Sequence, residues 1–139
     1  MMKKKERRKK VKIKSDGFYG HIFVNRRNET LLCAGRVRFL RLVNRFGSIK
    51  EAAEDYNISY RKAWNMVEKT NFAAGIPVIR TIKGGKKGGA SYLTPAGEKI
   101  LDLFMEFEVR HRKLMKDFTI EFEKRFSKIV KKDVPRLPE

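Results

Sequence analysis

The sequence offers few residues for covalent or metal-based chemistry. Its 139 residues include one cysteine, Cys33, and two histidines, His21 and His111, which lie far apart in the chain. A single thiol excludes a disulfide framework and a thiolate zinc site, and we expect Cys33 to be a reduced thiol packed in a helix. The glycine-rich run ending at Gly89 continues with Ala90-Ser91, not with the Lys-Ser/Thr of a nucleotide-binding loop. We therefore predict no catalytic residue, no metal and no cofactor, and hence no enzyme.

Long apolar runs are missing as well. No stretch approaches the ~18 apolar residues that can span a bilayer. The basic start lacks the apolar core of a secretory signal, and no acylation motif follows Met1. A polybasic segment that touches anionic lipid is the alternative, but we expect no membrane partner and a cytoplasmic, nucleoid-associated location.

Positive charge is abundant and clustered. The chain has 34 Lys and Arg against 16 Asp and Glu, a net charge of +18. Residues 1–14 contain nine basic side chains and one acid, and residues 59–93 contain seven basic side chains and one acid, Glu68. Because clustered charge attracts a polyanion, we expect double-stranded DNA as the partner. RNA is an alternative through charge alone, but no exposed aromatic platform for unstacked bases is evident.

The first part of the chain is predicted to be an arm followed by a hairpin. Residues 1–9 form a basic arm without apolar periodicity, expected to be disordered when free and to lie along phosphates. Residues 10–94 are expected to form one DNA-binding domain. It would open with the alternating strand Lys10–Lys14, a turn at Asp16-Gly17 and a return strand over Phe18–Val24.

Helix signals follow this hairpin. After a polar connector at Asn25–Thr30, Leu31–Phe46 has the apolar stripe of a helix, which Gly47 ends. Ser48 and Glu51 have the spacing of a capping box for a second helix. Asn57-Ile58-Ser59 is a turn, and a third helix is predicted from about Ser59 to Ala73. The outward face of this third helix comprises Arg61, Lys62, Asn65, Glu68 and Lys69.

A second hairpin and a long helix complete the pattern. Pro77–Ile82 and Ala90–Leu93 are predicted strands, and the Lys/Gly loop between them resembles a wing that contacts phosphates. Thr94-Pro95 is typical of a helix start, and the helical pattern runs to about Lys132, before a flexible tail at 133–139.

The apolar stripe of this long helix, over residues 95–132, repeats at three and four positions, which favours pairing with a second copy. The alternative is a helix that folds back on its own domain. The predicted dimerisation residues are Phe104, Phe107, Leu114, Phe118, Phe122 and Phe126.

Several of these segments together resemble one known family. They are Gly47-Ser48-Ile49 with Ala52-Ala53, Ile58-Ser59-Tyr60 with Ala63-Trp64, Asn71, the Gly84-Gly85-Lys86 and Gly88-Gly89-Ala90 wing, and Leu93-Thr94. Residues from about 11 to 105 are similar to the N-terminal winged-helix domain of ModE-type molybdate-responsive transcription regulators, which is itself similar to that of LysR-type regulators. The resemblance implies DNA binding and dimerisation. Family members continue into C-terminal molybdate-binding domains, which we do not expect here, so no small-molecule effector is evident.

We therefore expect a mostly helical α+β fold: a winged helix-turn-helix with an N-terminal hairpin and a long dimerisation helix. The predicted function is a sequence-specific transcription regulator of the stand-alone ModE-like type, which binds DNA as a homodimer. The alternative is an abundant nucleoid-associated protein with low sequence specificity. Expected base contacts come from Arg61, Asn65 and Lys62. Expected phosphate contacts come from Ser48, Ser59, Tyr60 and Lys69, and from Lys83, Lys86 and Lys87 of the wing.

Overall fold

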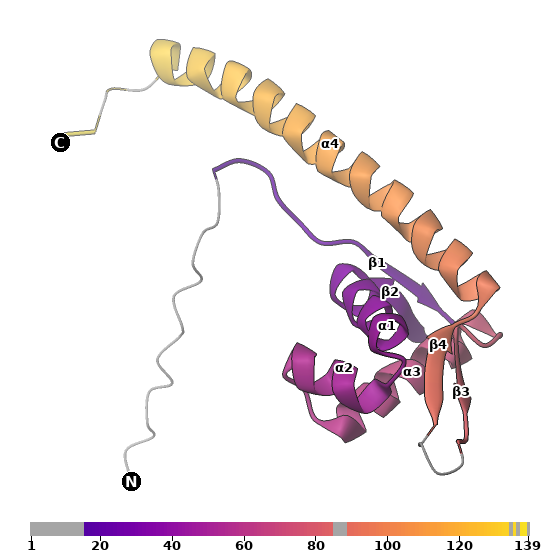
Figure 1. Ribbon diagram of the computed structural model, residues 1–139. Coiled ribbons are helices and arrows are strands. Elements are labelled where there is room, and N and C mark those ends of the chain that lie inside the picture. Colours follow the sequence, from indigo (N-terminus) through magenta and orange to yellow (C-terminus); the bar gives the residue numbers. More distant parts are fainter. Residues whose placement is uncertain (1–15, 85–88, 134, 136, 139) are drawn as a thin grey trace, which may run out of the picture. The chain divides into compact units, whose positions relative to one another are not determined.

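The computed structural model describes residues 16–84, 89–133, 135, 137 and 138. They fall into two compact units, one within Gly20–Leu114 and the other combining residues up to Tyr19 with residues from Met115 onward. The elements, in chain order, are β1 (Phe23–Arg26), β2 (Glu29–Cys33), α1 (Ala34–Phe46), α2 (Ile49–Tyr56), α3 (Tyr60–Ala74), β3 (Ile79–Ile82), β4 (Ala90–Leu93) and α4 (Pro95–Asp133) (Figure 1). This is the predicted mostly helical α+β fold with two hairpins and a long C-terminal helix.

The N-terminal hairpin exists, but its predicted position was wrong. Strands β1 and β2 pair antiparallel, and the turn between them is Arg27-Asn28, whose φ angles are 54° and 58°. The segment Asn25–Thr30 therefore contributes paired strand residues and the turn, and is no simple connector. The predicted first strand, Lys10–Lys14, lies outside the described residues.

The start of the first helix was also predicted too early. Leu31 and Leu32 belong to β2, and α1 begins at Ala34. Both leucines are buried, 7% and 1% exposed, so this strand is covered on both faces and shows no alternation that would distinguish it from a helix. Cys33 ends β2 and is half-buried, which corrects its predicted place inside a helix.

The helix-turn-helix forms as predicted because its caps are encoded locally. The Ser48 hydroxyl accepts a hydrogen bond from the Glu51 N–H at 3.2 Å and so begins α2. Asn57 takes the left-handed conformation that ends α2, with φ 58°. The Ser59 hydroxyl then accepts from the Lys62 N–H at 3.1 Å and begins α3.

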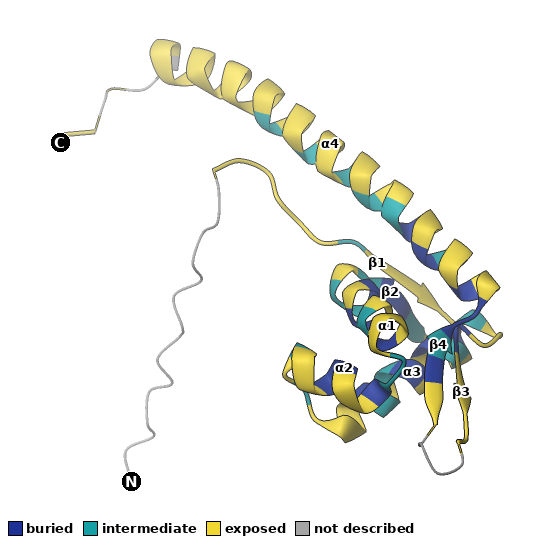
Figure 2. Ribbon diagram, in the orientation of Figure 1, coloured by how far each residue is buried: buried dark blue, intermediate teal, exposed yellow. Residues whose placement is uncertain are grey.

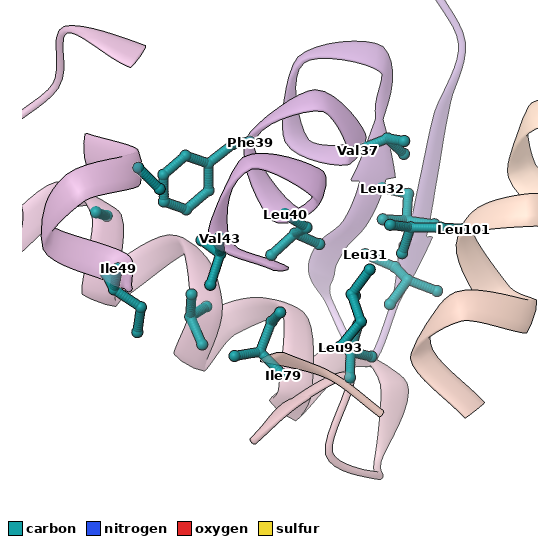
Figure 3. Packing of buried hydrophobic residues seen from close by; sticks show 14 of the residues in the cluster. Leu31, Leu32, Val37, Phe39, Leu40, Val43, Ile49, Ile79, Leu93 and Leu101 are labelled. Carbon is teal, nitrogen blue, oxygen red and sulfur yellow. The ribbon is translucent and has the colours of Figure 1, made fainter. Parts of the chain in front are cut away.

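The core of the larger unit lies between α1, α2, α3, β2 and the first turns of α4 (Figures 2 and 3). Phe39, Leu40 and Val43 of α1 are fully buried, and Leu32 of β2 and Leu101 of α4 pack into the same cluster. Small residues on α2 and α3 let these helices approach closely. They are Ala52, Ala53, Ala63 and Ala73, all nearly or fully buried.

Side-chain amides fix the β3–β4 hairpin, the wing, to this helical body. Asn44 of α1 accepts a hydrogen bond from the Leu93 N–H at 2.9 Å. Asn71 of α3 accepts from the N–H groups of Val78 and Ile79 at 2.8 and 3.1 Å and donates to the Ile79 carbonyl at 3.0 Å. The wing strands are therefore held in a defined place beside α3.

Candidate nucleic-acid interface

The outward side of α3 carries the residues predicted to bind DNA. Arg61, Lys62, Asn65 and Lys69 are all exposed. On the opposite side of the helix, the buried residues are Ala63, Val67, Thr70 and Ala73. Burial of that side fixes the rotation of the helix, so the four polar side chains, here called the cationic face, point away from the core.

The caps of α2 and α3 leave hydroxyl donors near this face. Ser48 and Ser59 use their oxygen lone pairs to accept backbone N–H groups. A hydroxyl that accepts in this way still has its own O–H to donate. Both predicted phosphate-binding serines can therefore cap a helix and bind a phosphate oxygen at once.

Tyr60 begins α3 and is 54% exposed. Its ring lies edge-on to Trp64, with centroids 6.2 Å apart and planes at 90°. Trp64 is half-buried and packs against the core, so it supports Tyr60 while the phenol faces solvent.

A hollow of about 740 Å³ separates the helix-turn-helix from the wing. Its lining includes Ser48, Tyr60, Trp64, Lys83, Gly84 and Ser91. Lys83 is exposed at the end of the described part of the wing. Lys86 and Lys87, predicted to contact phosphates, lie outside the described residues.

The predicted dimerisation residues of α4 divide into two groups. Phe104 is 3% exposed within the core of the larger unit. Its side chain is therefore buried within one chain, and we remove Phe104 from the predicted dimer interface. The other predicted residues are 41–50% exposed, namely Phe107, Leu114, Phe118, Phe122 and Phe126.

The smaller unit adds an aromatic residue that the sequence pattern did not identify. Phe18 donates its N–H to the Thr119 hydroxyl at 2.8 Å, and its ring meets those of Phe118 and Phe122 edge-on at 5.9 and 5.4 Å. Gly17 makes this approach possible, because its φ is +103° and a Cβ there would lie 2.4 Å from Thr119 Cγ2.

An open groove remains beside this contact. It has a volume of about 470 Å³ and is lined mainly by the rings of Phe18, Phe118, Phe122 and Phe126 together with Ile129. Phe18 was predicted to be a strand residue, and no local signal links it to a helix about a hundred positions away. The smaller unit therefore gathers aromatic residues from both ends of the chain.

Two other findings concern the described part of the chain. No helix there is long and apolar enough to cross a bilayer. Over the same residues, His, Cys, Asp and Glu side chains do not gather into a group that could hold a metal ion.

Comparisons with known proteins identify relatives. No protein-family model matches the chain. It is 37% identical over 103 residues to the molybdenum-pterin-binding protein MopB of Rhodobacter capsulatus, a match that covers 74% of this chain and 38% of MopB. It is 32% identical over 83 residues to the molybdenum transport protein ModE of Azotobacter vinelandii (60% and 31% covered). It is 38% identical over 69 residues to the transcriptional regulator ModE of Haemophilus influenzae (50% and 27% covered).

The chain thus spans 27–38% of the length of these three relatives. Among solved structures, the multiple antibiotic resistance repressor MarR is similar, with a TM-score of 0.47 and 16% identity over 75% of this chain and 78% of MarR. The curated relatives are named as regulators or as transport or binding proteins, in agreement with the prediction that the chain is no enzyme.

Proposed function

We propose that the chain regulates transcription in the cytoplasm by binding specific DNA sites as a homodimer. The proposal starts from the homology of this chain to the N-terminal region of ModE regulators, which gives it a ModE-like winged-helix DNA-binding domain. The observation that carries the proposal is the cationic face of α3, rigidly oriented by a buried opposite side. Molybdate binding is not part of it, because the matches cover at most 38% of a relative.

Helix α3 would enter the major groove. Arg61 would bind a guanine edge and Asn65 an adenine edge, since these side chains match the donor and acceptor pattern of those bases. Lys62 would lie at the margin of the groove. Contacts that position the protein without reading sequence would come from Ser48, Ser59, Tyr60, Lys69, Lys83, Lys86 and Lys87.

The exposed stripe of α4 supports the homodimer. Phe107, Phe118 and Ile129 recur at a spacing of eleven residues, and an eleven-residue apolar repeat is a period at which helices pair along their length. A second copy has the same repeat and can cover it. Two reading helices related by a two-fold axis then predict a near-palindromic site with half-sites about 10 base pairs apart or a multiple of that.

Two substitutions test the assignment of contacts. Arg61→Ala should weaken binding to the preferred site by about 1–3 kcal/mol and reduce the preference between sites. Lys86→Ala combined with Lys87→Ala should weaken binding to all sequences alike and make the salt dependence shallower by roughly two units. Equal losses on specific and random DNA for Arg61→Ala would remove it as a base-reading residue.

The second candidate function is a nucleoid-associated protein that coats DNA. The nine basic residues among the first fourteen favour it, because such a segment binds phosphates without regard to sequence. Genome-wide occupancy separates the two functions. A few sharp peaks support the regulator, whereas broad coverage supports the coating protein.

A further inference from the structure

The C-terminal end of α3 is held by side chains from a distant part of the chain. The last four carbonyls of a helix lack intrahelical partners, and the end of the helix carries partial negative charge. Gly75 donates its N–H to the carbonyls of Asn71 and Phe72 at 3.0 and 3.1 Å. The final carbonyls, those of Ala73 and Ala74, need donors from elsewhere.

Two arginines of the β1–β2 hairpin donate to carbonyls of this last turn, and one of them reaches both Ala73 and Ala74. Arg26 Nη1 donates to the carbonyls of Ala73 and Ala74 at 3.2 and 3.0 Å. Arg27 Nη1 donates to the Phe72 carbonyl at 3.2 Å, and its guanidinium carbon lies 4.4 Å from the centre of the Phe72 ring. We call these two residues the arginine cap. Each of its hydrogen bonds is charge-assisted and opposes the negative pole of the helix.

The hairpin turn places both arginines where they are needed. Arg26 pairs with Glu29 across the strands, and Arg27 and Asn28 form the turn with positive φ angles. Two residues with positive φ make the tight turn whose twist suits a two-residue hairpin loop. Successive side chains can thus both reach the helix end.

We propose that the N-terminal hairpin is a positioning device for the recognition helix. Arg26 and Arg27 fix the C-terminal end of α3, while Asn71 ties the same turn to β3. With its far end fixed, α3 presents Arg61 and Asn65 in one orientation. The inference rests on the proposed function, since it assumes that α3 reads DNA.

The arginine cap acts at a distance from the bases. Arg61 and Ala74 are separated by thirteen positions on α3, about 20 Å at 1.5 Å per residue. The guanidinium groups already donate to carbonyl oxygens. Arg26 and Arg27 are therefore positioning residues, and their loss should affect site preference more than general attraction to phosphate.

The test compares Arg26→Ala combined with Arg27→Ala against a control that removes the same charge. The control is Lys99→Ala combined with Arg112→Ala, because both side chains are exposed on α4. Amide hydrogen exchange, measured without DNA, should accelerate about tenfold at residues 72–75 of the arginine variant and stay unchanged in α1. The control should match the native chain at both places.

DNA binding gives the second measurement. The arginine variant should bind the preferred site about tenfold more weakly than the control does. Its affinity for random DNA should be within about twofold of that of the control. The slope of log affinity against log salt should be the same as in the control. Replacement of both arginines by lysine, which keeps the charge and one donor group each, should restore part of the preference.

Three results are decisive. Equal losses on both DNAs with a slope about two units shallower would overturn the proposal, because Arg26 and Arg27 would then be direct phosphate contacts. An unchanged rate of amide hydrogen exchange at residues 72–75 of the arginine variant would overturn the proposal too, because the arginine cap would then not stabilise the end of α3. If the native chain prefers no site, the proposed function fails, and the exchange measurement alone then decides whether the cap fixes the helix end.

Discussion

Helix α4 is one continuous helix in two different environments. Near its start, Leu101 and Phe104 are 0% and 3% exposed in the core of the larger unit. Further along, Phe118 and Phe122 follow the same period, yet they are 41% and 47% exposed. Figure 2 shows this change along α4, which has buried residues near its start and is mostly exposed further along. The pattern of apolar residues therefore identifies a stripe but does not say what covers it. The core covers the first part, and, of the residues that the structure describes, Phe18 covers some of the second part.

The two parts should respond differently to substitution. A buried leucine contributes to the folding stability of its own chain. An exposed phenylalanine contributes little to that stability, but burying it against a second copy stabilises a dimer by on the order of 2 kcal/mol. Large apolar patches on a protein surface commonly mark such interaction sites.

The largest effect is expected from charges in the exposed stripe. Phe118→Glu combined with Phe122→Glu should weaken self-association by about 8 kcal/mol, enough to leave no measurable dimer at micromolar concentration, because the homodimer loses four buried rings, two from each copy. DNA affinity should fall towards that of one half-site. Sedimentation equilibrium measures the association, and Ile120→Glu, at an exposed residue of the same helix outside the stripe, is the control. A monomer mass for the native chain at micromolar concentration would contradict the dimer.

The next effect concerns the buried part of the same helix. Leu101→Ala should lower the free energy of unfolding by about 2–5 kcal/mol, because the side chain is fully buried and leaves a cavity. Leu103→Ala, two positions on and 53% exposed, should cost less than about 1 kcal/mol. Denaturant titration below the dimer dissociation constant measures both. Similar losses of unfolding free energy for the two variants would contradict the burial of Leu101 in the core.

The helix-turn-helix could be predicted from the sequence because its signals are local. Ser48 and Ser59 each cap a helix within three residues, and Asn57 can adopt the left-handed conformation on its own. The first hairpin could not be placed in this way. Asp16-Gly17 is a strong turn signal, but the real turn at Arg27-Asn28 includes an arginine whose partner, the Phe72 carbonyl, is 45 residues away.

The residues of the candidate site likewise divide into those that local signals predict and those that depend on tertiary contacts. The exposure of Arg61, Lys62, Asn65 and Lys69 follows from the helical period alone. The roles of Arg26, Arg27 and Phe18 depend on tertiary contacts between segments 45 to 101 residues apart. The core position of Phe104 depends on where α4 leaves the larger unit, which its own period does not encode.

A smaller effect tests whether Phe18, which contacts Phe118 and Phe122, is part of the dimer interface predicted on the exposed part of α4. Gly17→Ala should displace Phe18, because the new Cβ would meet Thr119 and the positive φ disfavours a side chain. Self-association should weaken by about 1 kcal/mol, roughly fivefold. The unfolding of the larger unit should stay unchanged. The control is Gly20→Ala, where an added Cβ would lie no closer than 3.9 Å to a neighbour. Equal dimer affinity for both variants would remove Phe18 from the interface.

The smallest effect on stability is expected from the basic segment that precedes this contact. Residues 1–9 are mostly Lys and Arg and have almost no apolar content. We therefore expect them to contribute little to folding stability or to self-association. A chain without them should melt within about 2 °C of the full chain and self-associate equally well. Its affinity for random DNA should nevertheless fall strongly at low salt, and the difference should shrink as salt screens the charges. Calorimetry and a salt titration of DNA binding measure the two quantities. A large drop in melting temperature would show instead that the segment packs on the folded protein, and the exposed part of α4 would be the first surface to examine.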